Sequence, residues 1–486
     1  MTLFKKIAFL FLISLGPVQE VAAQACFPNQ VITSAFATGG TSPYRNDVLW
    51  LTWGSQLSNV NQYPYGRNGQ NLSVGSKSRA SIHLGGNSYL CIEVEITNVV
   101  GGSIDSYAPG NYVGDSMDKL YNIGGENSAN KLVCGIINRF DKGNSTITFK
   151  AKAKINGQPI RLSGLAIADA ESLSEEGEYI KATAVGSWNV VDIRKNISST
   201  NYLIGKRSGS DSKQTIEFAK GNNANTGAVA FLEFGSTAYN STDDLSVTFT
   251  AELKGQGMTA LALGLLTPNA DLGDAPESYG SPVHLIQNLK VNGDNISVTT
   301  NSTTNINSSN YSPGSLSLNP GKFLGSTAPD SDYSPKYSKD ALGDDTSGNG
   351  GINEEDAWPQ KYKRFSYKVN YTPGNQINTN IPFKNGVVGD YISGWIDFNL
   401  DGEFEESERQ SKRITRVDIN NGYVNLIWTV PETRVVKSTY VRLRYFDSKE
   451  DFTSSNNSVN FGEVEDHKMI ILIPKSTNIM LQNKKK

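Results

Sequence analysis

Hydrophobic and polar residues alternate along much of the first half of the chain. Two runs carry apolar residues at every second position: Leu90, Ile92, Val94 and Ile96, and Leu245, Val247, Phe249, Ala251 and Leu253. Successive side chains of a strand point to opposite faces, so this period of two predicts strands with one buried face. A third run, 147–155, is followed by Asn156-Gly157 and a further apolar run through Ile167. Asn-Gly between alternating runs predicts a hairpin with a type I′ turn.

The second half continues the strand pattern after a change of composition. Pro268-Asn269 ends an apolar run, and 292–313 is so rich in Asn, Ser and Thr that we expect an exposed loop. Strands are predicted at 365–371, around Trp395, in a hairpin about Asn421-Gly422, and at 441–445. No amphipathic helix is evident. The pattern predicts an all-β protein with two antiparallel β-sandwich domains in tandem, at 26–268 and 269–474.

The N-terminus has the features of a secretory signal peptide. Lys5 and Lys6 precede an apolar run from Ile7 to Leu15. The small-residue stretch Ala23-Gln24-Ala25 follows further along and offers a cleavage point. The run is too short for a stable membrane anchor, so 1–25 is predicted to be removed before Cys26. We therefore expect a secreted or cell-surface protein. Lipidation of Cys26 is the alternative, although Gln24 occupies a position where a lipobox has a small or branched residue.

Charge and composition exclude several classes of protein. The chain has 45 Lys and Arg against 48 Asp and Glu, a net charge of −3, which implies no basic face for nucleic acid. No later apolar run has the length of a transmembrane helix. The polar, basic tail 475–486 is predicted to be disordered. Oligomeric state is not indicated by these patterns.

Three cysteines are present in a chain predicted to reach an oxidising compartment. Cys26, Cys91 and Cys134 allow three single bridges, each leaving one thiol over. If Cys26 is lipidated, Cys91 and Cys134 form the default pair. Spacing alone does not choose among the three.

The segment 397–408 fits the calcium-loop pattern D-x-[DN]-x-[DN]-G-x5-E at each position. Its predicted Ca²⁺ ligands are the side chains of Asp397, Asn399 and Asp401, the carbonyl of Glu403, and the bidentate carboxylate of Glu408. Gly402 permits the sharp turn. The preceding 394–396 has the character of a strand, so we expect a calcium loop on a β scaffold. The alternative is a solvated Asp/Asn/Gly turn.

Further acidic clusters occur in the second half. They are Asp271, Asp274 and Glu277; Asp330 and Asp332; Asp344 and Asp345; Glu354, Glu355 and Asp356; and Glu463, Glu465 and Asp466. We expect each to form a solvated acidic face, with additional cation ligands as the alternative. None defines a catalytic carboxylate pair, and the three histidines lack metalloprotease spacing. With no nucleophile elbow or P-loop either, the chain is predicted to bind rather than catalyse.

Aromatic residues are the candidate ligand contacts in the first half. Trp50 and Trp53 lie in an apolar run and are predicted to be core. The tyrosines Tyr63, Tyr65, Tyr107 and Tyr112 lie among Gly and Asn, where rings can stack on sugars or anchor a protein partner.

Longer motifs carry a family resemblance over nearly the whole mature chain. The motifs of the first half are 50–54 (WLTWG), 107–115 (YAPGNYVGD), 168–172 (ADAES) and Trp188. They resemble the non-repetitive, lectin-like domain of CshA-type fibrillar adhesins. The motifs of the second half are 271–280 (DLGDAPESYG), 342–345 (LGDD), 395–402 (WIDFNLDG) and 462–466 (GEVED). They resemble the GEVED domain of secreted Bacteroidetes proteins.

The resemblance implies a jelly-roll or lectin-like sandwich that engages a host or matrix glycoprotein, then an Ig-like or jelly-roll-like sandwich. It adds Asp169 and Glu171, within the third motif, to the candidate ligand-binding residues. The predicted function is a surface adhesin that binds an extracellular glycoprotein or glycan, with calcium stabilising the second domain. The alternatives are a carbohydrate-active enzyme or its accessory module, and a structural spacer or assembly subunit.

Overall fold

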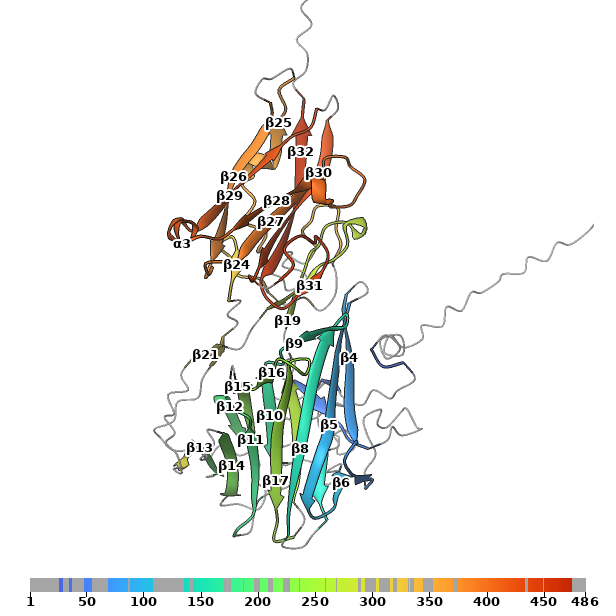
Figure 1. Cartoon of the computed structure of the whole chain (residues 1–486), viewed down its shortest axis with the longest axis vertical. Helices are drawn as coiled ribbons and strands as arrows, with labels where there is room; N and C mark the ends of the chain where they lie inside the picture. Colours follow the sequence, from blue (N-terminus) through green and yellow to red (C-terminus); the bar gives the residue numbers. More distant parts are fainter. Residues whose placement is uncertain are drawn as a thin grey trace, which may run out of the picture.

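The computed structural model shows a protein built almost entirely from β-strands (Figure 1). It describes residues 26–28, 35–36, 48–54, 69–85, 88–107, 135–139, 143–169, 173, 176–186, 188–195, 202–208, 213–221, 228–235, 237–257, 259–267, 269–286, 290–292, 303–305, 315–317, 321–330, 332, 336–343, 353–369, 374–432, 436–448 and 450–473. The predicted signal peptide, Cys134 and the predicted tail lie outside these residues. None of the described helices has the length and apolarity to cross a membrane.

The first sandwich, blue to green in Figure 1, is formed by two large sheets. One sheet has the order β12-β15-β10-β18-β7-β6-β3, with β2 paired to β18 and β1 to β2. Its strands are β1 (Ala35–Phe36), β2 (Val48–Leu51), β3 (Asn71–Leu72), β6 (Ile104–Tyr107), β7 (Gly135–Asn138), β10 (Gly164–Asp169), β12 (Trp188–Lys195), β15 (Ala228–Phe234) and β18 (Ala260–Leu266). The described pairings within it are antiparallel.

The opposing sheet has the order β22-β13-β14-β11-β17-β8-β5-β4, with β9 paired to β8 and β16 to β17. Its strands are β4 (Lys77–Gly85), β5 (Ser88–Gly101), β8 (Asn144–Ile155), β9 (Gln158–Ile160), β11 (Tyr179–Ala184), β13 (Tyr202–Ser208), β14 (Gln214–Gly221), β16 (Tyr239–Asn240), β17 (Ser246–Lys254) and β22 (Thr303–Asn305). The last strand belongs to the predicted exposed loop 292–313. Part of that loop is therefore an edge strand on the first sandwich.

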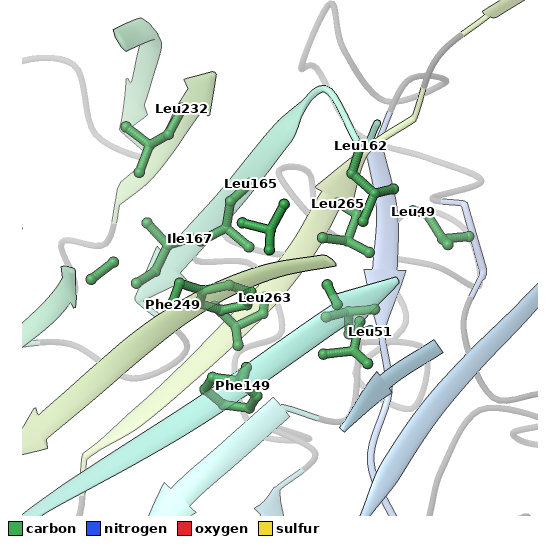
Figure 2. Close-up of a cluster of buried hydrophobic side chains, with 14 of the residues drawn as sticks. Leu49, Leu51, Phe149, Leu162, Leu165, Ile167, Leu232, Phe249, Leu263 and Leu265 are labelled. Atoms are coloured by element: carbon green, nitrogen blue, oxygen red, sulfur yellow. The ribbon is translucent and has the colours of Figure 1, made fainter. Parts of the chain in front are cut away.

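The inward faces of the two sheets form one apolar core (Figure 2). Phe149 on β8 stacks on Phe249 on β17, with ring centroids 5.1 Å apart, and Trp53 packs beside them. Trp50 and Trp53 are both buried, which confirms their prediction as core. Burial of this apolar surface is the main stabilising contribution to the first sandwich.

The alternation predicted for the first half is confirmed on β5, β8 and β17, except that Leu245 lies in a turn before β17 with φ of 54°. On β5 the apolar side chains at 90, 92, 94 and 96 are buried, and Cys91, Glu93 and Glu95 lie on the outer face. The hairpin is also as predicted, since Asn156 and Gly157 have φ of 50° and 85° between the paired strands β8 and β9. After Ile160 the chain leaves this sheet, and 164–169 forms β10 in the opposite one.

The second sandwich, orange to red in Figure 1, is smaller. A five-stranded sheet, β25-β32-β30-β27-β28, faces a three-stranded sheet, β24-β26-β29, around an apolar core. The strands are β24 (Phe323–Leu324), β25 (Arg364–Ser366), β26 (Gln376–Lys384), β27 (Tyr391–Ile396), β28 (Arg409–Arg413), β29 (Tyr423–Thr429), β30 (Lys437–Phe446) and β32 (Glu463–Leu472), with 3₁₀ turns η3 (Gln360–Tyr362) and η4 (Glu406–Glu408). The pair β25–β32 is parallel, and the other pairs of these two sheets are antiparallel.

The predicted hairpin about Asn421-Gly422 is wrong. Arg416–Asn421 forms a short helix, α3, and Gly422 is its left-handed C-cap with φ of 74°. Thr415 and Asp418 form a capping box at the start of this helix, which stabilises helical backbone where a turn was expected. The strand that follows, β29, does show the predicted alternation, but it pairs with β26 rather than with the preceding strand.

Residues 269–292 connect the two sandwiches. Strands β19 (Asn269–Leu272) and β20 (Val283–Ile286) form a hairpin around the 3₁₀ turn η2 (Glu277–Tyr279), and β20 pairs in parallel with β31 (Ser458–Val459). Leu272 and Val283 belong to the apolar core of the first sandwich. The connector thus packs on one sandwich and pairs with a strand of the other. A separate pair is formed by β21 (Lys290–Asn292) and β23 (Ser315–Ser317).

Candidate functional site

The predicted calcium loop leaves the end of β27 and returns through η4 into β28. Asp397 and Glu408, at its two ends, are buried, whereas Asn399, Asp401 and Glu403 are exposed. Gly402 has φ of 87°, and a Cβ there would lie 2.9 Å from Ser278 Oγ, so the predicted role of this glycine in the turn agrees with the structure.

Side-chain oxygens of the loop accept hydrogen bonds from its own backbone. Glu408 Oε1 accepts from the amide of Phe398 at 2.6 Å, and Asn399 Oδ1 accepts from the amide of Asp401 at 3.0 Å. Asn399 Nδ2 donates to Asp401 Oδ2 at 2.7 Å and to Glu405 Oε2 at 3.1 Å. Two carboxylates therefore converge on one side-chain amide, and Glu405 is a neighbour that the spacing argument did not include.

The buried end of the loop is attached to the connector between the sandwiches. The Tyr279 hydroxyl donates to Asp397 Oδ2 at 2.6 Å, and Trp428 Nε1 donates to the carbonyl of Glu408 at 3.0 Å. Burial, and then the bond to Asp397, raise the pKa of Tyr279. Burial likewise raises the pKa of Glu408. Positive charge placed in the loop would favour the ionised form of Glu408.

The predicted ligand-binding residues of the first sandwich are only partly described. Tyr107 is half-buried at the end of β6, and Asp169 is completely buried at the end of β10. Tyr63, Tyr65, Tyr112 and Glu171 lie outside the described residues.

The outer face of β8 carries a ladder of charge. Lys150 Nζ lies 3.2 Å from Asp243 Oδ2, Lys152 pairs with the same carboxylate, and Lys154 Nζ lies 2.9 Å from Asp244 Oδ2. Because these side chains are partly exposed, the pairs contribute little to stability and mainly keep the face polar. On the neighbouring strand, a disulfide joins Cys91 to Cys26 and so attaches the N-terminal residues to this sheet.

The acidic clusters that the structure describes are not the solvated faces that we expected; Asp344 and Asp345 lie outside the described residues. Most of the described carboxylates are buried: Asp271, Asp274, Asp332, Glu354, Glu463, Glu465 and Asp466, whereas Glu277 and Asp356 are exposed. Four of these buried carboxylates accept hydrogen bonds from backbone amides of distant segments. Glu463 accepts from Leu324, Glu465 from Ala357 and Asp466 from Ala275, and Asp271 accepts from Val464 of the segment 462–466. The reason is that the second sandwich has long irregular segments whose buried amides require acceptors.

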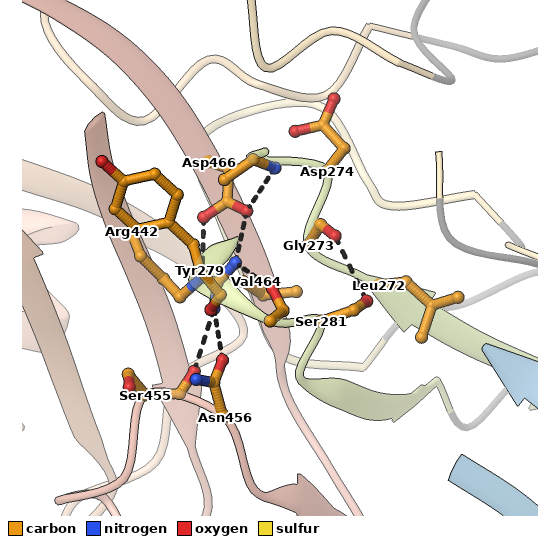
Figure 3. Close-up of polar contacts among 12 residues, drawn as sticks. Leu272, Gly273, Asp274, Tyr279, Ser281, Arg442, Ser455, Asn456, Val464 and Asp466 are labelled. Carbon is orange, nitrogen blue, oxygen red and sulfur yellow. Dashed lines mark hydrogen bonds and ion pairs between the residues drawn. The ribbon is translucent and has the colours of Figure 1, made fainter. Parts of the chain in front are cut away.

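Two buried arginines complete this network. Arg442 and Asp466 form a bidentate pair with N–O distances of 2.8 and 2.7 Å (Figure 3). Arg442 also donates to the carbonyl of Tyr279 and to Asn456 Oδ1. Arg444 Nε donates to His284 Nε2 at 2.8 Å. The segment 462–466 therefore holds the connector and several loops against the five-stranded sheet through hydrogen bonds.

Sequence reasoning missed one group of side chains. Glu355, Glu465 and His467 have donor atoms that all lie within 4.8 Å of one another, and His467 was not singled out. The signal was present as Glu463-x-Glu465-x-His467, because residues two apart in a strand share a face.

Comparison with known proteins finds one family model in each half of the chain. Residues 46–266 match the family model of the surface adhesin CshA non-repetitive domain 2, which covers most of the first sandwich. Residues 391–470 match the GEVED domain model, a range that contains the loop 397–408 and the segment 462–466. No curated protein and no solved structure matches the chain. The chain therefore carries a CshA-type non-repetitive domain, of a surface-adhesin kind, followed by a GEVED domain.

Proposed function

We propose that this protein is an exported surface adhesin whose first sandwich binds an extracellular glycoprotein or glycan without altering it. The observation that carries the proposal is the match of 46–266 to an adhesin domain, a range that contains most strands of the first sandwich. A rigid sandwich suits this role because its strands hold the connecting loops in place, so little conformational entropy is lost on binding.

The candidate contacts are aromatic side chains at strand ends and in loops. Tyr107 ends β6 with part of its side chain exposed. Tyr63, Tyr65 and Tyr112 extend the set. Asp169 has no exposed surface, so we expect no direct contact between its side chain and a ligand.

A binding screen tests the proposal. The purified mature chain is applied to a glycan array and to immobilised matrix glycoproteins, and the best ligand is titrated against the variants Tyr63→Ala, Tyr107→Ala and Tyr112→Ala. Tyr89→Ala, a tyrosine of the outer face of β5 outside the candidate set, is the matched control. We expect at least one candidate variant to lose about tenfold or more in affinity, as contact aromatics do, and the control to bind normally. Release of a cleaved product, or no binding to any ligand, contradicts the proposal.

We also propose that Ca²⁺ binds the loop 397–408 and stabilises the second sandwich. Its support is the donor chemistry: Asn399, Asp401 and Glu405 are exposed oxygen-bearing side chains that already contact one another, and Asp397 and Glu408 lie at the loop's ends. Ca²⁺ takes six to eight oxygen ligands, including backbone carbonyls such as that of Glu403.

Calorimetry tests this calcium proposal. We expect the melting temperature of the second sandwich to rise with millimolar Ca²⁺ and to fall when EDTA is added, because an ion that binds only the folded state stabilises it. Asp401→Asn should remove most of the shift. The matched control is Asp451→Asn, an acidic loop residue of the same domain outside the pattern. Equal melting with and without Ca²⁺ argues against the site.

A further inference from the structure

Strand β32 turns three ionisable side chains toward the interior of the second sandwich. Glu463, Glu465 and His467 share one face of the strand, and the same face continues with Met469 and Ile471 of the apolar core. Glu463 and Glu465 have no exposed surface, and His467 is 2% exposed. Burying charged or polar groups lowers the stability of the fold unless hydrogen bonds, an opposite charge or a metal ion compensates them.

A fourth side chain reaches the same place from another segment. Glu355 enters from 353–358, and its side chain is only 8% exposed. His467 Nε2 lies 2.9 Å from Glu465 Oε2 and 3.6 Å from Glu355 Oε2. Among the described residues, this is the set of acidic, histidine and cysteine side chains whose donor atoms gather within 4.8 Å.

The carboxylates of this cluster are only partly satisfied. Glu355 Oε1 accepts the amide of Asp466, and Glu465 Oε2 accepts the amide of Ala357 and is hydrogen-bonded to His467 Nε2. Within the described part of the chain, Glu355 Oε2, Glu465 Oε1 and Glu463 Oε1 are buried and have no hydrogen-bond donor. Arg442 does not compensate them, because it pairs with Asp466, whose side chain lies on the opposite face of β32.

We propose that Glu355, Glu465 and His467 bind a divalent transition-metal ion of the Zn²⁺ class inside the GEVED domain. The donor set favours this ion because imidazole with carboxylates suits Zn²⁺, whereas Ca²⁺ requires a larger shell of oxygens. Ligands at 2.0–2.1 Å from a tetrahedral Zn²⁺ lie about 3.3 Å apart, close to the 3.6 Å between His467 Nε2 and Glu355 Oε2. The 2.9 Å contact between His467 Nε2 and Glu465 Oε2 is a hydrogen bond, which the ion would replace. Glu463 supplies further negative charge from the same face.

The surroundings of the cluster are those of a structural metal site. The second oxygen of Glu355, Oε1, accepts the amide of Asp466, and the amide of Ala357 orients the carboxylate of Glu465 through Oε2, so both carboxylates are fixed as outer-shell partners fix ligands in metal sites. The ring of His467 lies against Trp358, with centroids 6.4 Å apart. The ion would fasten the segment 353–358 to β32. This site is separate from the loop 397–408 in both position and donor chemistry.

Metal binding by the intact mature chain tests the inference. The protein is stripped with a chelator, dialysed against Zn²⁺ and analysed for metal content, with His467→Gln and Glu355→Gln as test variants. His83→Gln is the matched control, since His83 lies on β4 outside the cluster. We expect one tightly held Zn²⁺ in wild type and control. In both test variants we expect binding to be weaker by about 10–100-fold or more, because loss of an outer-shell partner alone already costs that much. Zinc retained by both test variants, or lost only in the control, overturns the inference.

A spectroscopic measurement on the wild-type chain keeps the inference testable if a variant does not fold. X-ray absorption of the zinc-loaded protein should show a shell of nitrogen and oxygen donors with a single imidazole. A shell without imidazole overturns the inference, as does a folded, stripped chain that binds no Zn²⁺ at all.

Discussion

The two sandwiches of this protein are stabilised in different ways. The first has an apolar core between two large sheets, and the lysine–aspartate ladder of β8 lies on its outer face, although a few charged residues such as Asp169 are buried. The second has a smaller apolar core, and it buries Arg442, Arg444, Glu463, Glu465 and Asp466 completely. The comparison shows that strand pairing supplies most backbone hydrogen bonds in the first sandwich, whereas buried side chains must supply many of them in the second.

Strand length is the physical reason for the contrast. In the first sandwich β5 and β8 have 14 and 12 residues, so most of their backbone groups are satisfied by neighbouring strands. In the second, irregular segments such as 273–282 and 353–358 pack against the sheet. Their buried amides need acceptors, and buried carboxylates supply them. The carboxylates in turn require arginine, and by our inference a metal ion.

The largest expected effect comes from breaking the buried ion pair. Arg442→Met leaves Asp466 buried without its partner and removes the donors to Tyr279 and Asn456, so we expect a loss of about 3–5 kcal/mol in unfolding free energy. Denaturant unfolding followed by hydrogen exchange over 437–472 measures it.

The matched change in the first sandwich is Glu93→Gln, which weakens a partly exposed pair with Lys77 and Arg79. We expect it to cost less than about 1 kcal/mol. Equal losses of unfolding free energy in Arg442→Met and Glu93→Gln would show that the two sandwiches do not differ in how much their ion pairs stabilise them.

Truncation of the apolar core is the corresponding test of the first sandwich. Leu263→Ala, on the buried strand β18, should cost about 2–5 kcal/mol because it leaves a cavity between the two sheets. Calorimetry should show the lower melting temperature in the first sandwich while the second is unchanged. A loss below 1 kcal/mol would mean that the core is less tightly packed than the structure indicates.

A smaller effect is expected from His284, which is buried beside Arg444. Burial lowers its pKa well below the usual value, with the Arg444 charge acting in the same direction. Below about pH 6.5 the unfolded chain takes up a proton that the folded chain cannot, so stability falls as pH falls.

For this one group the loss is about 1.4 kcal/mol at pH 5.5. His284→Gln should therefore lose less stability than wild type between pH 7.5 and 5.5, as measured by urea unfolding at both values. His467, whose pKa burial lowers to about 3, is present in both proteins and does not affect the difference. An identical pH dependence in the variant contradicts this prediction.

The smallest expected effect concerns the helix that replaced the predicted hairpin. Thr415→Ala removes the capping box with Asp418 and should cost about 1 kcal/mol. Amide exchange at Ile419 and Gly422, which bond back to Thr415 and Asp418, reports on α3 directly. Unchanged exchange would show that the cap does not stabilise the helix.

The alternation of apolar residues predicted the strands well because burial of one face is a local property of the chain. It predicted β5, β8, β17 and the turn at Asn156-Gly157. The prediction for Asn421-Gly422 was wrong because Asn-Gly serves equally as a helix C-cap, and the helix N-cap at Thr415, earlier in the same segment, was not weighed against it. The calcium loop stays a prediction.

What the sequence by itself determined is the all-β class, the identity of the core positions and the family motifs, because each is encoded in nearby residues. Only the tertiary structure decided that the acidic motifs are buried, because their carboxylates accept hydrogen bonds from backbone amides up to 193 residues away in the sequence. The tertiary structure also decided that Glu355 lies close to Glu465 and His467, which are more than 100 residues away in the sequence. Periodicity shows which face a residue occupies, but the partner on that face depends on how distant segments pack.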